Sequence, residues 1–300
     1  MVHAAAEAGA DYAKIQSMLA DDLPRRERFE EGVVDGAGTQ QAIKRPYEPE
    51  FKRLKPMDLT DDDHHWFIEE CQKAGIKPMT TVFSRSRVPF VATLGMEAVK
   101  VASYDCASLP LLEELAANFD HLYISTGATY DEEIEATANF LKARNQSFSL
   151  LHCVTIYPTP LDEMHLARID YLRQYAPKVG FSDHSLVSRD GIKASAVAIM
   201  RGADVVERHF TVLGPDESRD GPVSLNPAEL AELVRVARME QAEKEAWVAE
   251  HVGSFDEMIG EKTRPLSHTE LLNRDYYRGR FASRVNGDWV YNWEDKPVAA

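Results

Sequence analysis

The stretches Gly180-Phe181-Ser182-Asp183-His184-Ser185 and Val205-Val206-Glu207-Arg208-His209-Phe210-Thr211 each place a histidine at the end of a short apolar run. A segment long enough for a helix separates the two runs, which predicts two neighbouring parallel strands. The ends of such strands meet at one edge of the sheet, where α/β barrels carry their active sites. Two imidazoles at that edge can hold a divalent metal. Glu207 lies two residues before His209, so both side chains share one face of the strand.

The rest of the chain repeats this alternation of strand and helix. The predicted strands lie at 11–16, 77–81, 98–101, 121–125, 148–152, 178–181 and 204–208. The predicted helices lie at 2–8, 60–75, 86–95, 109–118, 130–144, 162–175, 189–201 and 227–248. Strands that alternate with helices form a parallel sheet, and this number of units favours an α/β fold of the (β/α)8 TIM-barrel type. Seven strands are found instead of eight, which predicts a barrel that is missing its first β-strand.

The predicted domain organisation is simple. Residues 1–250 are expected to form the barrel domain, and residues 251–300 a C-terminal extension outside the barrel pattern. Within the barrel, residues 17–59 form a long, charged connection between a strand and a helix. Connections of this length are typical of substrate loops or mobile lids.

Composition excludes several classes of function. The chain has 300 residues, of which 44% are hydrophobic, and this suits one barrel-sized domain. A net charge of −15 argues against non-specific binding to nucleic acid or to anionic membranes. The three cysteines are widely spaced and form no CxxC motif, which fits a reducing, cytoplasmic compartment. The sequence has no run of about 18 apolar residues and no signal peptide, so a soluble, unexported protein is expected.

Polar residues gather where the predicted strands end, the edge at which a barrel carries its chemistry. Besides the residues named above, they are Lys14, Gln16, Thr80, Thr81, Ser84, Arg85, Lys100, Ser103, Ser125, Thr126, Gly127, His152, Thr155 and Tyr157. Burial of Lys14 and Lys100 on apolar strands costs free energy unless each ammonium group meets an anion. The hydroxyls of Thr81, Ser103 and Ser182 are common companions of a bound phosphate or carboxylate.

Each of these residues also has a plain structural explanation. A histidine at the end of a strand is often a hydrogen-bonded core residue. Lys100 could reach the surface or pair with Asp105, and Glu207 could pair with Arg208.

Other polar residues are expected to have no part in chemistry. His64 and His65 lie in the acid-rich first turn of a predicted helix and are expected to be solvated. Asp61 to Asp63 are expected to cap that helix. Cys153 is expected to be a small buried filler.

Seven motifs follow one another in order between about residues 5 and 230. They are the segments 8–16, 80–85, 100–103, 125–127, 151–158, 180–185 and 202–211. Together they resemble the sialic acid synthase (N-acetylneuraminate synthase) family, whose members condense phosphoenolpyruvate with a sugar aldehyde to make nonulosonic acids.

The resemblance implies roles for individual residues. Positions that hold phosphoenolpyruvate in the family are matched by Lys14, Thr81, Lys100, Ser103 and Ser182. His184 and His209 match its metal ligands, usually for Mn²⁺, with Mg²⁺ or Co²⁺ as alternatives, and Glu207 matches its proposed acid/base. Gln16, Ser125 and Thr155 are expected to bind substrate as well. Tyr157 and Asp220 lie where the family contacts the acceptor sugar or a metal-bound water. The resemblance also implies a homodimer.

The chain departs from the family pattern at several places. The family usually has Asn where Thr155 stands, and often has Glu where Asp105 stands. The family's first strand, with a glutamate that reads the acceptor sugar, is not found. Its C-terminal antifreeze-like domain is not found either.

The predicted function is therefore a sialic acid synthase-type condensation of phosphoenolpyruvate with an N-acylated hexosamine-like aldehyde, with release of phosphate. Two alternatives are open. One is another barrel enzyme that uses the same face, such as a metal-dependent aldolase or a deoxy-sugar-phosphate synthase. The other is a truncated, non-catalytic relative that binds a ligand or a partner.

Overall fold

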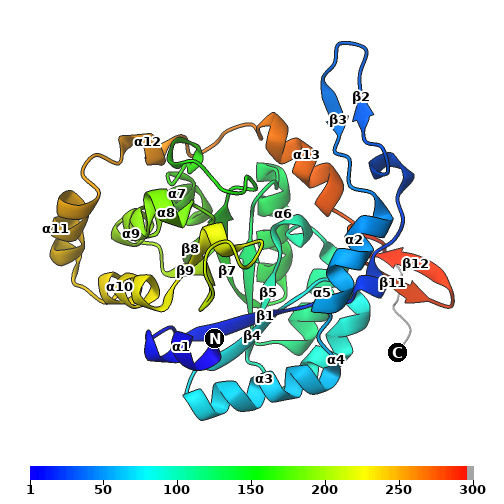
Figure 1. The fold of residues 1–300 in the computed structure, drawn as a ribbon, viewed down its shortest axis with the longest axis horizontal. Coiled ribbons are helices and arrows are strands. Elements are labelled where there is room, and N and C mark those ends of the chain that lie inside the picture. Colours follow the sequence, from blue (N-terminus) through cyan, green and yellow to red (C-terminus); the bar gives the residue numbers. More distant parts are fainter. Residues whose placement is uncertain (296–300) are drawn as a thin grey trace. The chain divides into compact units, whose positions relative to one another are not determined.

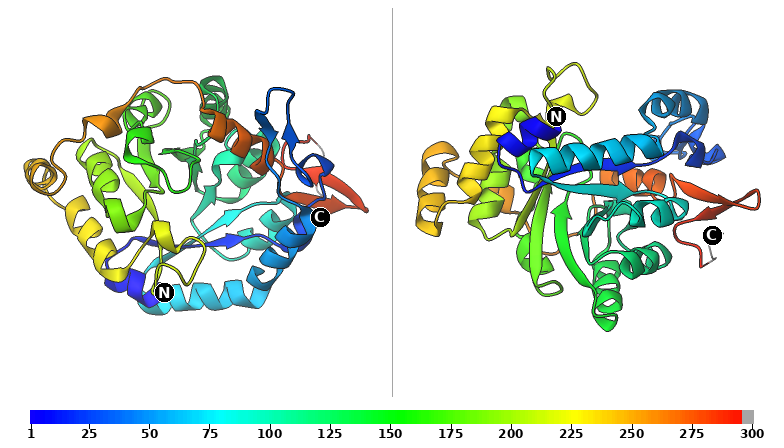
Figure 2. Two further views of the ribbon diagram at one scale, coloured as in Figure 1. Left: turned by 45° about the horizontal axis from the view of Figure 1, so that its top comes forward. Right: turned by 90° about the horizontal axis from the view of Figure 1, so that it is seen from below.

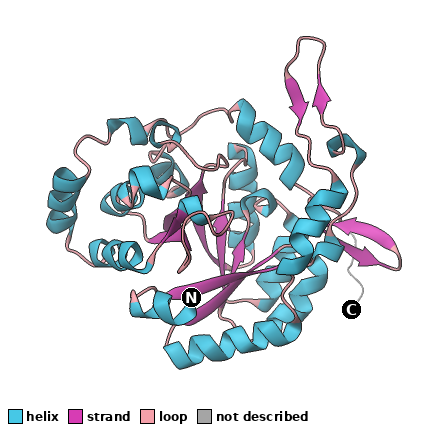
Figure 3. Cartoon of the chain, in the orientation of Figure 1, coloured by secondary structure: helices cyan, strands magenta, loops and turns pink. Residues whose placement is uncertain are grey.

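Parallel strands joined by helices make up the fold in the computed structural model, which describes residues 1–295 (Figure 1, Figure 3). The strands are hydrogen-bonded in the order β1-β4-β5-β6-β7-β8-β9-β10. Their bounds are β1 (Tyr12–Ser17), β4 (Lys77–Val82), β5 (Ala98–Val101), β6 (His121–Ser125), β7 (Ser147–Cys153), β8 (Lys178–Asp183), β9 (Val205–Phe210) and β10 (Ser224–Leu225). The predicted α/β class with a parallel sheet is confirmed.

The predicted number of strands is wrong, because the sheet contains an eighth strand. β10 has two residues and pairs with β9 through Ser224↔His209 and Leu225↔Phe210. A strand of two residues has no hydrophobic period that a sequence pattern can reveal. The absence of the family's first strand and the closure of the sheet into a barrel stay predictions.

The helices between the strands fall close to the predicted positions. They are α1 (Val2–Glu7), α3 (Asp61–Ala74), α4 (Val88–Ala92), α5 (Leu109–Asn118), α6 (Asp131–Ala143), α7 (Arg168–Leu172), α8 (Val187–Asp190), α9 (Lys193–Met200), α10 (Pro227–Ala237) and α11 (Gln241–His251). Two predicted helices are each broken into two. Gly191 has a φ of +54°, which ends α8 before α9 begins. Glu240 caps α11 and separates it from α10.

The chain divides into two compact units. Unit 1 comprises Met1–Ala13, Glu69–Pro78 and Phe148–Pro265. Unit 2 comprises Lys14–Ile68, Met79–Ser147 and the chain from Leu266 onward. The predicted domain boundary at residue 250 stays a prediction.

The core of unit 1 lies around strands β7 and β8, whose side chains are buried on both faces. Leu150, Leu151, Val179 and Phe181 are all at most 1% exposed. Helix α9 packs on β8 through a run of small and branched side chains that is buried from Ala194 to Ile199. Strands covered on both faces read as continuous apolar runs, and this is why the sequence located them well.

Unit 2 contains β4, β5 and β6 together with α5 and α6. Leu111, Leu112 and Leu115 of α5 are fully buried, at the spacing of one helix face. The long connection at 17–59 also belongs to this unit. It contains the hairpin of β2 (Val33–Val34) and β3 (Gln40–Ala42) and the helix α2 (Tyr47–Leu54), as Figure 1 shows.

The end of the described chain is ordered into elements that the sequence analysis did not predict. Helix α12 (Asp256–Ile259) lies in unit 1, and helix α13 (His268–Tyr277) belongs to unit 2. The antiparallel hairpin of β11 (Ala282–Val285) and β12 (Asp288–Tyr291) follows α13, as the orange-to-red segment of Figure 2 shows. Among residues 1–295, no helix has the length and apolar composition needed to cross a bilayer.

Candidate active site

Strands β8 and β9 bring four of the predicted site residues of unit 1 into two contacting pairs. The register aligns Ser182 with Glu207, and the Ser182 hydroxyl donates a hydrogen bond to Glu207 Oε2 over 2.9 Å. His184 follows β8 and His209 lies in β9, and their ring centroids are 5.2 Å apart. Because side chains alternate along a strand, Glu207 and His209 lie on the face that Ser182 and His184 share.

The environment of His184 keeps its imidazole neutral. Burial, together with the neighbouring His209, lowers the pKa of His184 to about 3. The Tyr157 ring packs 4.2 Å from the His184 ring, and the sulfur of Cys153 lies 3.9 Å from Nδ1. A neutral imidazole offers the lone pair that a metal ligand needs.

Asp220 lies beside the histidine pair. Its Oδ2 atom is 3.8 Å from Nδ1 of His209. Among residues 1–295, no group of three or more His, Cys, Asp or Glu side chains has the geometry of a complete metal site. The neutral imidazole of His184, the imidazole of His209 and one nearby carboxylate still fit a first-row divalent metal, because water and substrate oxygens can complete the coordination of a catalytic site.

A buried ion pair lies directly behind these residues, on the opposite face of the same two strands. Asp183 and Arg208 are aligned by the strand register, and their side chains are 0% and 2% exposed. Asp183 also accepts hydrogen bonds from the Ser185 amide and the Ser195 hydroxyl. Burial acts to raise the pKa of Asp183, but Arg208 and these donors hold the pKa below its ordinary value. The pair joins β8 to β9, and Asp183 is therefore a structural residue.

The predicted substrate residues of unit 2 lie on β1, β4, β5 and β6. Lys100 is 4% exposed, and its Nζ donates to the Ser125 hydroxyl over 2.6 Å and to the Val101 carbonyl over 2.8 Å. Thr81 is the register partner of Lys100, and Lys14 Nζ lies 3.4 Å from the Thr81 hydroxyl. Two ammonium groups and two hydroxyls thus gather on four neighbouring strands.

Comparison with known proteins shows the family of the chain. The model of the NeuB family matches residues 1–247. The chain belongs to the NeuB family. The sequence is 30% identical over 247 residues to an N,N'-diacetyllegionaminic acid synthase of Legionella pneumophila, covering 79% of this chain and 66% of that protein. It is 28% identical to a pseudaminic acid synthase of Campylobacter jejuni, covering 94% of this chain and 76% of that protein.

A solved structure supports the fold of this NeuB-family chain. An N-acetylneuraminic acid synthetase from Leptospira borgpetersenii, crystallised with citrate, is 27% identical. The superposition has a TM-score of 0.66 and covers 92% of this chain and 84% of that one. The chain spans about two thirds of the length of the Legionella relative.

The remaining predicted residues of the NeuB-family site are placed as follows. Ser103 and Thr155 are buried, Gln16 is exposed and Tyr157 is 51% exposed. Three other strand-end residues serve structural contacts. His152 Nε2 donates a hydrogen bond to the Met164 carbonyl over 2.7 Å, and burial lowers the pKa of His152 to about 3. Ser84 donates to Asp22, and Arg85 pairs with Glu114.

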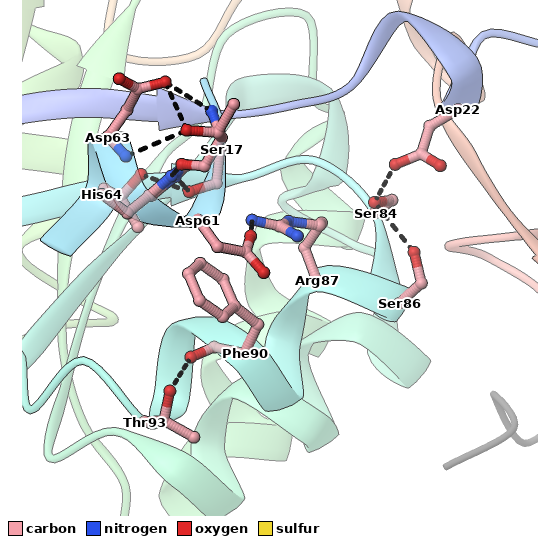
Figure 4. A network of polar contacts seen from close by, with 12 residues as sticks. Ser17, Asp22, Asp61, Asp63, His64, Ser84, Ser86, Arg87, Phe90 and Thr93 are labelled. Carbon is pink, nitrogen blue, oxygen red and sulfur yellow. Dashed lines mark hydrogen bonds and ion pairs between the residues drawn. The ribbon is translucent and has the colours of Figure 1, made fainter. Parts of the chain in front are cut away.

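One expectation about a histidine is wrong. His64, predicted to be solvated, is 1% exposed. It contacts Thr60 and Ser17, and Figure 4 shows it beside Ser17. Its Nδ1 is 2.7 Å from the Thr60 carbonyl, which can only accept, so Nδ1 carries the proton. Nε2 therefore accepts from the Ser17 hydroxyl, 2.6 Å away. The helix cap predicted at Asp61 to Asp63 is confirmed, since Asp63 accepts from the amide and hydroxyl of Thr60.

Proposed function

We propose that this chain catalyses the condensation of phosphoenolpyruvate with an N-acylated hexosamine-like aldehyde, releasing phosphate and forming a nonulosonic acid. Membership of the NeuB family supports the reaction class. The observation that carries the proposal is the contact between His184 and His209, with Glu207 hydrogen-bonded to Ser182 in the same strand register. The homodimer implied by the resemblance belongs to this proposal as well.

His184 and His209 are the residues that would hold a divalent metal, for which we propose Mn²⁺. Such a metal supplies Lewis acidity toward the carbonyl oxygen of the acceptor. Asp220, beside His209, is positioned to accept a hydrogen bond from water or from a sugar hydroxyl near this pair.

Charge and hydrogen bonding assign the anionic reactant to the lysines and hydroxyls. Lys14 and Lys100 would offset the charges of the phosphoenolpyruvate carboxylate and phosphate, with Thr81, Ser103, Ser125 and Ser182 as hydroxyl donors. Lys100 needs no large movement to do so, because its ammonium group is already held by Ser125. Gln16, Thr155 and Tyr157 are assigned to substrate binding by the family resemblance.

The reaction requires one carbon–carbon bond to form and one carbon–oxygen bond to break. Carbon C3 of phosphoenolpyruvate attacks the aldehyde carbon, and a water molecule adds at C2. The resulting tetrahedral carbon loses phosphate by C–O cleavage and becomes the keto group of the product. The proton released from its new hydroxyl balances the one taken up by the alkoxide that forms from the aldehyde. Glu207 takes the proton of the attacking water, and the hydrogen bond from the Ser182 hydroxyl fixes the orientation of the Glu207 carboxylate.

A phosphate-release assay tests the proposal directly. The protein is incubated with Mn²⁺, phosphoenolpyruvate and a panel of N-acetylated hexosamines. Glu207→Gln should lower kcat by about 100-fold or more, since general-base catalysis contributes at least that much, and should keep phosphoenolpyruvate binding.

The exposed Glu250→Gln is the matched control and should keep full activity. Full activity in Glu207→Gln would remove Glu207 from the mechanism. Phosphate release only with a phosphorylated acceptor would favour a deoxy-sugar-phosphate synthase instead.

A further inference from the structure

The C-terminal hairpin forms hydrogen bonds to the very segments of unit 2 that carry the predicted phosphoenolpyruvate residues. We call residues 281–294, which contain Phe281, β11, β12 and the three residues that follow, the C-terminal brace. The NeuB-family match ends at residue 247, so the brace lies outside the part of the chain that the family model describes.

Three contacts tie the brace to the chain just beyond β4. The Ser283 hydroxyl accepts a hydrogen bond from the Ser86 amide over 2.9 Å. The Glu294 carbonyl accepts from Arg85 Nη1 over 2.6 Å. The Phe281 ring packs 5.5 Å from the Phe83 ring. The brace is therefore docked on unit 2 through backbone and buried side-chain groups, and it is an integral part of that unit.

Asn292 makes the central contact of the brace. Its side chain is 2% exposed, and Nδ2 donates to the Phe83 carbonyl over 2.9 Å and to Asp105 Oδ1 over 3.1 Å. Because the Phe83 carbonyl can only accept, the amide nitrogen has to face it, which fixes the orientation of the side chain. The backbone carbonyl of Asn292 accepts a hydrogen bond from the Ser108 hydroxyl over 2.5 Å.

The two acceptors of Asn292 lie just beyond the ends of two neighbouring strands, β4 and β5. Phe83 lies two residues after Thr81 on β4, and Asp105 lies two residues after Ser103 and five after Lys100 on β5. β4 and β5 are paired at Thr81↔Lys100. One amide group of Asn292 thus links the two chain segments beyond that pair, where they run into separate turns.

We propose that Asn292 is a positioning residue for phosphoenolpyruvate binding, which acts by holding the segments after β4 and β5 at a fixed separation. This inference rests on the proposed function, because it assumes that Thr81, Lys100 and Ser103 bind phosphoenolpyruvate. The Ser103 turn is held from its other side by Thr129, whose hydroxyl donates to the Ser103 carbonyl over 3.2 Å. Loss of Asn292 leaves the turn supported on one side only.

The test is a direct measurement of phosphoenolpyruvate binding by calorimetry, with the full chain and without acceptor sugar. Asn292→Leu keeps the size of the side chain and removes both hydrogen bonds. We expect its Kd for phosphoenolpyruvate to rise by about 10-fold, since a displacement of about 1 Å in a binding group has effects of this order or larger. In turnover, the KM for phosphoenolpyruvate should rise in the same way while kcat stays within about threefold.

A control variant and a second variant keep the test decisive. Asn286→Gly lies in the exposed turn of the same hairpin at a φ of +52°, which glycine adopts easily, and its Kd should equal that of the wild type. If Asn292→Leu does not fold, Ser108→Ala removes only the bond to the Asn292 carbonyl, and its Kd should rise by about threefold. An unchanged Kd in the folded Asn292→Leu or, failing that, in Ser108→Ala overturns the inference.

The inference and the proposed function fail in different ways. Wild-type protein that binds phosphoenolpyruvate but releases no phosphate with any acceptor contradicts the proposed function alone. Asn292→Leu with a lower Tm and an unchanged Kd shows a purely structural role and contradicts the inference alone. Wild-type protein that does not bind phosphoenolpyruvate contradicts both.

Discussion

Asp105 is a buried acid whose charge state should control part of the pH dependence of stability. Burial raises the pKa of Asp105 to about 7, against the lowering effect of the Asn292 amide, whereas an unfolded chain gives about 3.9. The folded state then holds a proton that the unfolded state releases, so stability falls as pH rises from about 4 through 7. Between pH 5 and pH 8 this loss should amount to about 2–3 kcal/mol.

Asp105→Asn removes this titration and keeps an oxygen that can accept from Asn292. The variant should therefore gain about 2–3 kcal/mol relative to the wild type between pH 5 and pH 8, measured by urea unfolding at several pH values. The exposed Asp120→Asn serves as control and should follow the wild-type curve. Parallel curves for Asp105→Asn and the wild type would show that Asp105 is ionised in the folded state throughout this range.

Individual site residues could be predicted because they stand at strand ends, but their burial could not always be predicted. His64 is an example. Its acidic neighbours indicate a solvent-exposed position, yet His64, Phe67 and Cys71 are buried and are spaced so that they share one helix face. That i, i+3, i+7 pattern was present in the sequence and would have placed His64 on the inner face of α3. Asn292 offered no such pattern, because its acceptors Phe83 and Asp105 lie 209 and 187 residues away in the chain.

The buried ion pair between Asp183 and Arg208 links β8 to β9. Removing one partner leaves an uncompensated buried charge, so Arg208→Met should lower the free energy of unfolding by about 3–5 kcal/mol. Asp183→Asn together with Arg208→Met removes both charges and keeps an acceptor for Ser185 and Ser195. The double variant should recover to within about 1–2 kcal/mol of the wild type.

Urea unfolding measures both variants. Arg235→Met is the control, since Arg235 pairs with Glu232 in an exposed ion pair on α10, and it should change stability by less than about 1 kcal/mol. If the double variant is no more stable than Arg208→Met alone, the two side chains do not act as a pair.

Elements with strong local signals were predicted well, and elements defined by tertiary contacts were not. Helix α5 has the predicted bounds 109–118, with Pro at its first turn and an apolar face. The hairpin β11–β12 was missed although Asn286-Gly287 is a strong turn signal, because its strands are four residues each. The helix predicted at 227–248 is two helices, since Glu240 forms a cap that a continuous hydrophobic period conceals.

At the scale of the whole molecule, the predicted chemistry is divided between the two compact units. Lys14, Thr81, Lys100, Ser103 and Ser125 belong to unit 2, whereas Ser182, His184, Glu207, His209 and Asp220 belong to unit 1. The sequence could predict where most of these residues stand, in or just after an apolar strand. It could not predict which groups are in contact, such as Lys100 with Ser125, because strand register depends on the folded sheet.

This division predicts that removal of the metal should abolish turnover and leave the binding of phosphoenolpyruvate nearly unchanged. Protein treated with a chelator should lose phosphate release, because the acceptor carbonyl is no longer polarised, and added Mn²⁺ should restore it. Phosphoenolpyruvate binding should change by less than about threefold, since most of its proposed contacts are lysines and hydroxyls of unit 2. Calorimetry on the stripped protein measures the binding, and the phosphate assay measures the turnover.

His209→Ala identifies the residue that holds the metal. The variant should bind phosphoenolpyruvate and stay inactive at every Mn²⁺ concentration that restores the wild type, because one of two imidazole ligands is missing. His268→Ala, an exposed histidine at the start of α13, should be restored as the wild type is. Full restoration of His209→Ala would exclude the histidine pair as the metal site. Loss of phosphoenolpyruvate binding on chelation would instead mean that the metal acts on both reactants, so that the functions of the two units are not separable.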